Sequence, residues 1–450
     1  MDAPDPLSPL RAFRDELYGC FGRRADALFE VADALLASAP VASLPHLSLS
    51  PLHRRGWGSV YGALAEGSLG ADALRRALAA RPLAGGEPVD AVDVSVWPRC
   101  DAEASPEQGY SYHPSRHSAG QPIVAGWAYQ WLAQLSFERE SWTAPLDVRR
   151  VQPGENANGV AAEQISAFAA ARPEADGVPL FVFDAGYDPV QLTQGLTGVA
   201  AAILVRLRSG RCFYADPSPA APSPKGGRPR RHGATLDCAD PATWPDADAE
   251  HGDEDGQYGH VRVRSWAGLH PKRQEHADRG SRRPRPLVRG ALVLVEVQRL
   301  PRQTRRPKEL WLWWHGPGEP DLGVLWRAYA RRSGLEHTLR FCKQGLGWTT
   351  PRPRRPEQAD RWTWLVVAAS THLRLARPWV ADRRLPWERR LPAEKPTPSR
   401  VRRGVPQLLA ALGSPAAGPK PCGRSPGRPR GSRTGPAPRH PAVKRAKKAA

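Results

Sequence analysis

The chain has 450 residues, more than one hydrophobic core usually organises, so two or three structural units are expected. Its 65 Lys and Arg residues outnumber 45 Asp and Glu residues, and the net charge of +20 favours a polyanionic partner such as nucleic acid. No apolar run is long enough to span a bilayer, and the amino terminus lacks the pattern of a signal peptide. The six cysteines form no C-x-x-C pair, which argues against a structural zinc site or a disulfide framework. We therefore expect a cytoplasmic protein with no membrane partner.

Residues 1–84 predict a helical amino-terminal domain. Apolar residues recur there at helical spacing: Phe13, Leu17, Phe21, Leu28, Val31 and Leu35. Such a domain can bind DNA or act as a helical cap, and the pattern does not separate the two.

Residues 85–208 predict the first part of an α/β domain. The segment 89–97 is rich in valine, as a strand in the middle of a sheet would be, and Asp93 interrupts it. Leu180–Phe183 is a short apolar run that ends in Asp184. Further strands are expected at 122–130, 145–151 and 201–207, and helices at 161–171 and 190–196. Functional groups collect at the carboxyl ends of strands in open sheets, and Asp184 is in that position.

Residues 209–320 predict a β-rich insertion with strands at 292–297 and 310–314. Residues 321–385 then return to helices and complete the α/β domain. Residues 386–450 are dense in Pro, Gly and Arg, which predicts a disordered basic tail. From 395 onward this tail holds fourteen Lys or Arg residues and no acid. A concentrated basic tail is typical of a binding device.

Four residues follow a Y-x2-R-x3-E-x6-K spacing: Tyr329, Arg332, Glu336 and Lys343. On one continuous helix their side chains would lie within an arc of roughly 60°. A neighbouring stripe of Leu335, Leu339, Cys342 and Leu346 would dock that helix on a core. The spacing predicts a helix that presents a carboxylate between cationic and phenolic groups.

Asp93, Asp184 and Glu336 are hard oxygen donors that the fold could bring together. Such a triad can hold two Mg2+ ions about 3.5–4 Å apart at a phosphodiester. Asp90 and Asp101 remain alternatives to Asp93 as the first ligand, although Asp90 lies on the opposite face of the strand. Taken alone, Asp184 is compatible with a turn residue, and Glu336 with a surface ion pair.

The segment from Tyr329 to Lys343 resembles the Y-R-E-K signature of DDE transposases from bacterial insertion sequences, and the contexts of Asp93 and Asp184 resemble their acidic motifs. The resemblance covers roughly residues 85–378. It implies a ribonuclease H-like mixed sheet flanked by helices, with a β-rich insertion before Glu336. It also implies that Asp93, Asp184 and Glu336 bind two Mg2+ ions, with Mn2+ as a substitute, and that Tyr329, Arg332 and Lys343 contact DNA.

The activity that this resemblance implies is cleavage at transposon DNA ends, followed by strand transfer into target DNA. The expected partners are those two DNAs, with room for a homodimer on the DNA, in a bacterial cytoplasm next to the nucleoid. Within the tail, Gly427, Arg428, Pro429 and Arg430 resemble an AT-hook core, although nonspecific phosphate binding fits this tail better. Trp311, Trp313 and Trp314 suit core packing better than base stacking. Two rivals stay open: a nuclease of this fold without strand transfer, and a noncatalytic DNA-binding protein.

Overall fold

The computed structural model describes residues 5–442 except 39, 84, 86–87, 114–121, 139, 174–176, 218–231, 273–286, 302–308, 393–394, 422–426, 428 and 434. The chain forms two compact units. Unit 1 comprises Met1–Ala84, Val94–Glu155 and Gly334–Ala450, and unit 2 comprises Gly85–Asp93 and Asn156–Ser333. Strand β1 (Val89–Pro98) gives its first residues to unit 2 and its last residues to unit 1. Each unit is therefore discontinuous in sequence.

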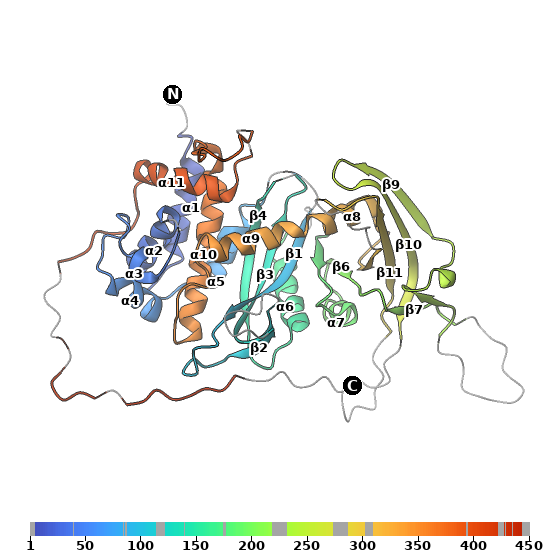
Figure 1. The fold of residues 1–450 in the computed structure, drawn as a ribbon, viewed down its shortest axis with the longest axis horizontal. Helices are drawn as coiled ribbons and strands as arrows, with labels where there is room; N and C mark the ends of the chain where they lie inside the picture. The colour runs from blue at the N-terminus through green and yellow to red at the C-terminus, as the bar shows by residue number, and fades with distance from the viewer. Residues whose placement is uncertain are drawn as a thin grey trace, which may run out of the picture. The chain divides into compact units, whose positions relative to one another are not determined.

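Unit 1 is built around one long buried helix, α10. Its helices are α1 (Ser8–Gly19), α2 (Ala25–Ala37), α3 (Leu44–Leu47), α4 (Gly58–Glu66), α5 (Ala71–Ala79), α9 (Ser333–Gln344), α10 (Pro356–Ala376), η3 (Arg377–Trp379) and α11 (Pro398–Leu412). Its strands β2 (Gly109–Tyr112), β3 (Ile123–Leu135) and β4 (Thr143–Val151) pair antiparallel in that order. Helix α10 packs against α2, α11 and β4, as Figure 1 shows. It can do so because residues 362–373 are buried almost without interruption.

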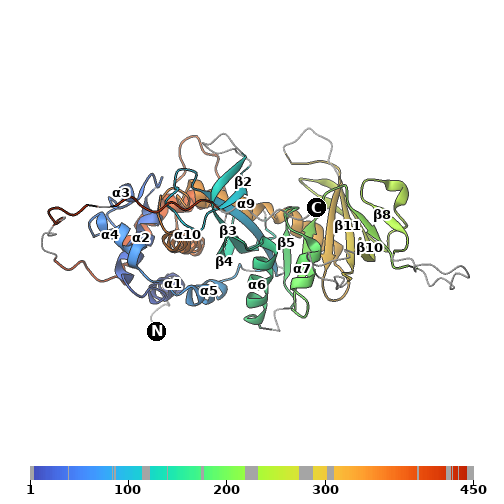
Figure 2. The same cartoon turned by 90° about the horizontal axis from the view of Figure 1, so that it is seen from below.

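Unit 2 is a mixed sheet with helices beside it. Parallel strands β1, β5 (Leu180–Phe183) and β6 (Ala202–Arg206) continue into an antiparallel part made of β12 (Leu310–His315), β11 (Gly290–Val297), β10 (Gly259–Pro271) and β9 (Ala249–Asp255). The small strands β7 (Cys212–Tyr214) and β8 (Thr235–Asp237), the turn η2 (Pro241–Thr243) and helix α8 (Leu322–Arg331) complete this part. Helices α6 (Ala157–Ala170) and α7 (Pro189–Gly195) lie side by side (Figure 2). This connectivity makes β1, β5 and β6 adjacent parallel strands, and β5 and β6 end at the same level.

The predicted α/β class is confirmed, with a mixed sheet flanked by helices. Strand β5 coincides with the predicted run, and β11 and β12 lie within two residues of their predicted bounds. Over its described residues, the segment 209–320 contains strands β7 to β12 together with the 3-10 helix η2 and irregular connections. Short apolar runs between turn residues were enough to locate these strands, since β-branched and aromatic side chains favour them.

Tyr329 and Lys343 do not lie on one continuous helix, as the spacing had suggested. Helix α8 ends at Arg331 and α9 begins at Ser333, so Tyr329 and Glu336 lie on different helices. The Arg332 N–H donates to the carbonyl of Tyr329, and Ser333 Oγ donates to the carbonyl of Ala330 at 3.3 Å. Serine bonded to a preceding carbonyl tends to bend a helix, and the glycine that follows has low helix propensity. The predicted apolar stripe on α9 is nevertheless buried.

The disorder predicted for residues 386–450 is wrong for Pro398–Leu412, because these residues form helix α11, which packs on α2 and α10. Its apolar residues Val401, Val405 and Leu409 recur every four positions and are buried. Arg402 is also buried, and its guanidinium donates to carbonyl oxygens of Leu35, Ser38 and Gly345. Some of the tail's basic residues therefore hold unit 1 together. The high content of Pro and Arg favoured a prediction of disorder, although the apolar residues keep this helical spacing.

The predicted domain boundaries also differ from the compact units. Residues 1–84 do not stand apart as a helical domain, since they belong to unit 1 together with 94–155 and 334–450. Arg81 illustrates the reason, because its carbonyl accepts a hydrogen bond from Arg374 of α10. Such pairings between distant segments leave no local trace in the sequence.

Candidate active site

Three charged residues lie at one level across the parallel strands of unit 2: Asp93 is within β1, Asp184 directly follows β5, and Arg206 ends β6. Strand β1 pairs with β5 in a register that aligns Ala91 with Val182, so two residues further on Asp93 is level with Asp184. Strand β5 pairs with β6 with Phe183 opposite Val205, so Asp184 is in turn level with Arg206. Neighbouring strands are about 4.8 Å apart. The topology therefore brings two carboxylates and one guanidinium close together. For Asp184 this agrees with the expectation that functional groups collect at the carboxyl ends of strands.

Arg332 lies between the two aspartates. Its Nη2 atom is 3.0 Å from Asp93 Oδ2 and 3.9 Å from Asp184 Oδ2. The Arg332 side chain is only 8% exposed, against 18% for Asp93 and 41% for Asp184. Two carboxylates thus converge on one positive nitrogen, at a place that is shielded from solvent on the side of Arg332.

Asp184 is held by its own turn. Its Oδ1 accepts a hydrogen bond from the Gly186 N–H at 2.8 Å, and its backbone carbonyl accepts one from Tyr187. A Cβ atom at position 186 would approach Asp184 Oδ1 to 3.0 Å, which explains a glycine there. The turn role that the sequence suggested is therefore real, and it leaves Oδ2 directed at Arg332.

Tyr329, at the end of α8, is hydrogen-bonded to Arg206. Burial raises the pKa of the Tyr329 phenol above its usual value, and the positive charges of Arg206 and Arg332 oppose that rise. The phenol therefore stays protonated near neutral pH. Arg206 was missed by sequence reasoning, although it ends an apolar strand just as Asp184 follows one. The same rule of strand ends could have found it.

The alternatives to Asp93 have different surroundings. Asp90 is fully buried in β1, its Oδ2 has no hydrogen-bond partner among the described residues, and burial raises its pKa to about 7. Asp101 lies in a turn and forms an ion pair with Arg352 at 3.1 Å. Of the three, only Asp93 is paired with Arg332.

Glu336 and Lys343 lie on α9 and belong to unit 1. Glu336 is exposed in the first turn of that helix, and the Lys343 ammonium is 5.7 Å from the ring centroid of Trp348, a cation–π contact. Over the residues that the structure describes, no group of three or more His, Cys, Asp or Glu gathers as a metal site. Membership of Glu336 in a triad with the two aspartates stays a prediction.

The basic motif of the tail is described only in part, and the three tryptophans lie in the core of unit 2. Arg428 lies outside the described residues, and Arg430 is exposed in a turn. Trp311, Trp313 and Trp314 are at most 8% exposed, with Trp311 packed against the rings of Trp244 and Trp266. Their faces serve the core of unit 2, as packing predicts, and not base stacking.

Comparison with known proteins gives a family for the chain. Residues 16–272 match the family described as DDE superfamily endonuclease, a stretch that contains Asp93 and Asp184 and ends before Glu336. No curated protein matches the chain. Within the described part, no helix combines the length and the apolar character that crossing a membrane requires. The matched stretch covers more than half of the chain, and an endonuclease of this kind acts on DNA. The chain belongs to the DDE superfamily of endonucleases.

Proposed function

We propose that the protein is a DNA transposase that cleaves transposon ends in a Mg2+-dependent reaction and transfers the exposed strand into target DNA. The observation that carries this proposal is the convergence of Asp93 and Asp184 on the Nη2 atom of Arg332, at 3.0 and 3.9 Å. Two carboxylates that are level with each other on adjacent parallel strands suit a cationic centre in an endonuclease. Family membership supports the nuclease part of the proposal.

The donors present fit a hard divalent cation. Mg2+ prefers carboxylate oxygens, and Asp93 and Asp184 already direct one oxygen each towards a positive atom. In the proposal Asp93, Asp184 and Glu336 are the ligands, and Mn2+ can replace Mg2+. Bound metal ions would supply charge stabilisation and an activated oxygen nucleophile at the phosphodiester. Arg332 neutralises the two aspartates until such ions bind.

Asp93 is preferred over Asp90 because of the charge that each position tolerates. A fully buried carboxyl whose pKa is about 7 is largely protonated in a mildly acidic solution, whereas Asp93 has a guanidinium 3.0 Å away that stabilises its charged form. A metal ligand must be deprotonated to bind. The geometry therefore supports Asp93 as the first ligand.

The remaining roles concern the DNA. In the proposal Arg332 binds a phosphate through its planar fork, and Lys343 does so as a point charge. Tyr329, protonated through its raised pKa, can donate a hydrogen bond to the same strand. Arg428 and Arg430 of the tail are assigned to nonspecific phosphate contacts. The protein would work on the DNA as a homodimer.

The test uses the purified full-length protein, Mg2+, labelled DNA from the flanks of its gene and a target plasmid. Joined products are expected for the wild type, and neither cleavage nor joining for Asp184→Asn or Glu336→Gln. Glu319→Gln is the matched control, since Glu319 is an exposed acid outside the site. Cleavage without joining would favour a nuclease without strand transfer. Normal processing by both site variants would refute the catalytic assignment of these residues. If the wild type shows no Mg2+-dependent processing at all, the noncatalytic DNA-binding protein is favoured instead.

A further inference from the structure

The connection between α9 and α10 in unit 1 carries three arginines in four positions and no acid. Its sequence over residues 351–356 is Pro-Arg-Pro-Arg-Arg-Pro, and residues 350–355 are called the arginine loop below. Arg352, Arg354 and Arg355 are all exposed, and the Arg352 side chain is 80% exposed. Like charges this close repel one another, so the loop favours a bound anion that offsets the repulsion.

The backbone of the arginine loop is fixed to the core of unit 1. Pro351, near its start, and Pro356, directly after it, are buried. Arg99, a buried residue that follows β1, donates from its guanidinium to the carbonyl oxygen of Pro353, and the same guanidinium lies 5.2 Å from the centroid of the Trp127 ring. Proline also fixes its own φ and favours an extended conformation in the residue before it. The loop therefore keeps one backbone shape without a ligand.

Gln358, in the first turn of α10, holds the two consecutive arginines by their backbone. Its Oε1 atom accepts hydrogen bonds from the N–H groups of Arg354 and Arg355, at 3.1 Å each. This arrangement leaves the two guanidinium groups exposed on a backbone that is held in place. A preorganised site loses less conformational entropy on binding than a flexible chain does.

Only one of the three arginines has an acidic partner within the described part of the chain. The Nη1 atom of Arg352 lies 3.1 Å from Asp101 Oδ2, and both side chains are exposed. An exposed pair of this kind contributes about 0.2–1 kcal/mol, so a phosphate can replace Asp101. Arg354 and Arg355 form no ion pair with any described residue. The loop therefore keeps two positive charges that no described carboxylate neutralises.

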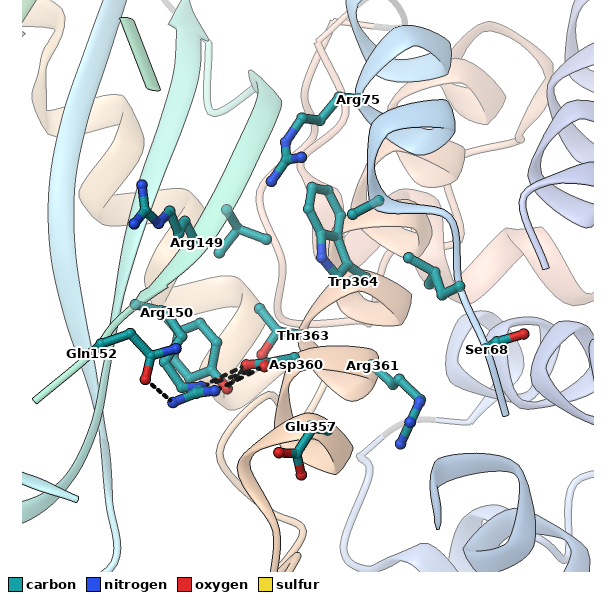
Figure 3. A pocket seen from close by; sticks show the side chains of 14 residues that line it. Ser68, Arg75, Arg149, Arg150, Gln152, Glu357, Asp360, Arg361, Thr363 and Trp364 are labelled. Carbon is teal, nitrogen blue, oxygen red and sulfur yellow. Dashed lines mark hydrogen bonds and ion pairs between the residues drawn. The ribbon is translucent and has the colours of Figure 1, made fainter. Parts of the chain in front are cut away.

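The acids that follow the loop, in the first turns of α10, line a cavity. Glu357 and Asp360 contribute to the wall of this cavity, whose volume is about 430 Å³ (Figure 3). There Asp360 pairs with Arg150 at 3.0 Å and accepts a hydrogen bond from the Tyr129 hydroxyl at 2.7 Å. The charge of Asp360 is therefore offset by Arg150 and not by the arginine loop.

We propose that the arginine loop binds the phosphate backbone of duplex DNA, with Arg354 and Arg355 on neighbouring phosphates and Arg352 exchanging Asp101 for a third. A guanidinium binds phosphate through two parallel N–H donors. Duplex DNA carries one negative charge per about 1.7 Å of its axis, and three residues of chain span at most about 11 Å, so several phosphates are within reach of the loop. This inference rests on the proposed function, to which it adds a DNA contact outside the Y-R-E-K residues and the tail.

The experiment measures how the full-length protein binds a labelled duplex from the flank of its gene in EDTA, so that no strand is cut. Arg354→Gln and Arg355→Gln are each expected to weaken binding by about tenfold in low salt. Each should also reduce the slope of log K against log salt by about 0.9, the value of one phosphate contact, and the double variant should reduce it by about 1.8. Arg76→Gln is the matched control, because Arg76 is exposed on α5 and its replacement removes the same charge. Affinities and slopes equal to those of Arg76→Gln would overturn the proposal.

Gln358→Ala tests the fixed backbone, since it keeps all three arginines but removes the acceptor that holds two of them. This variant should bind DNA about threefold more weakly with an unchanged salt slope, because the phosphate contacts remain while the loop must be ordered on binding. Binding equal to that of the wild type would contradict a preorganised loop.

Polyglutamate forms a further arm, because it is an anion of a different chemical class. Arg354→Gln is expected to leave its weak binding unchanged. If the variant weakens the binding of polyglutamate as much as that of DNA, the loop is a general anion surface and the DNA assignment is refuted.

Failure of this inference is distinguishable from failure of the proposed function. Asp184→Asn is expected to bind DNA in EDTA like the wild type and to lose cleavage in Mg2+. If Asp184→Asn cleaves normally, the proposed chemistry is wrong, whatever the loop variants do. If Asp184→Asn loses cleavage while Arg354→Gln and Arg355→Gln bind DNA normally, only the assignment of the arginine loop falls.

Discussion

Replacing Asp90 by asparagine should change how the stability of the protein depends on pH. The Asp90 carboxyl is completely buried in β1, and burial raises its pKa from 3.8 to about 7, with the charge of Arg172 opposing the rise. Asparagine has nearly the same shape as the protonated acid but does not titrate. The variant therefore removes one proton-binding group from a site where only the neutral form is tolerated.

The magnitude follows from the two pKa values. In the unfolded chain the carboxyl loses its proton above pH 3.8, whereas in the folded protein it keeps the proton until about pH 7. Between these values the folded state binds more protons, so the wild type loses stability as pH rises. Each pKa unit is worth 1.36 kcal/mol, so the loss sums to about 4 kcal/mol. Asp90→Asn should escape that loss.

The assay is urea unfolding of both proteins at several values between pH 4 and pH 8. The unfolding free energy of Asp90→Asn minus that of the wild type should rise by about 4 kcal/mol over this interval and be level above it. Val92→Ala is the control, because it shortens a buried, non-titrating side chain of the same strand. It should lower the unfolding free energy by an amount that does not vary with pH. A difference for Asp90→Asn that does not vary with pH would refute the assigned protonation of Asp90.

Arg332→Gln leaves Asp93 without its cation and should lower the unfolding free energy by about 2 kcal/mol, less than the 3–5 kcal/mol of a fully buried pair because Asp93 is 18% exposed. Mg2+ should raise the melting temperature of this variant more than that of the wild type, and an equal rise would contradict the neutralising role of Arg332. A chain that ends at Gly418 should melt like the wild type but bind DNA more weakly and with a smaller salt dependence in a titration. A chain that ends at Arg390 also lacks Arg402, which holds the end of α2, and should melt at a lower temperature. Equal melting of the two truncations would contradict that role.

Much of the secondary structure could be predicted because it depends on local spacing. The run at β5 and the alternation around β11 and β12 identify strands wherever they lie in the fold, since side-chain period and β-propensity are properties of neighbouring residues. The buried face of α9 was visible for the same reason. Helix α11 was missed, because its regular apolar spacing lies within a composition that favours disorder.

Local patterns in the sequence predict where an apolar strand ends, and so place Asp184 at the carboxyl end of a strand. The packed fold is needed to show that Arg332 lies between Asp93 and Asp184, and that Arg206 bonds Tyr329. These partners are separated by more than ninety residues, and their meeting depends on strand register and on the way α8 returns to the sheet. The end of a strand depends on neighbouring residues in the sequence. An ion pair depends on the distance between two side chains that are far apart in the sequence, and the packing of the chain sets that distance.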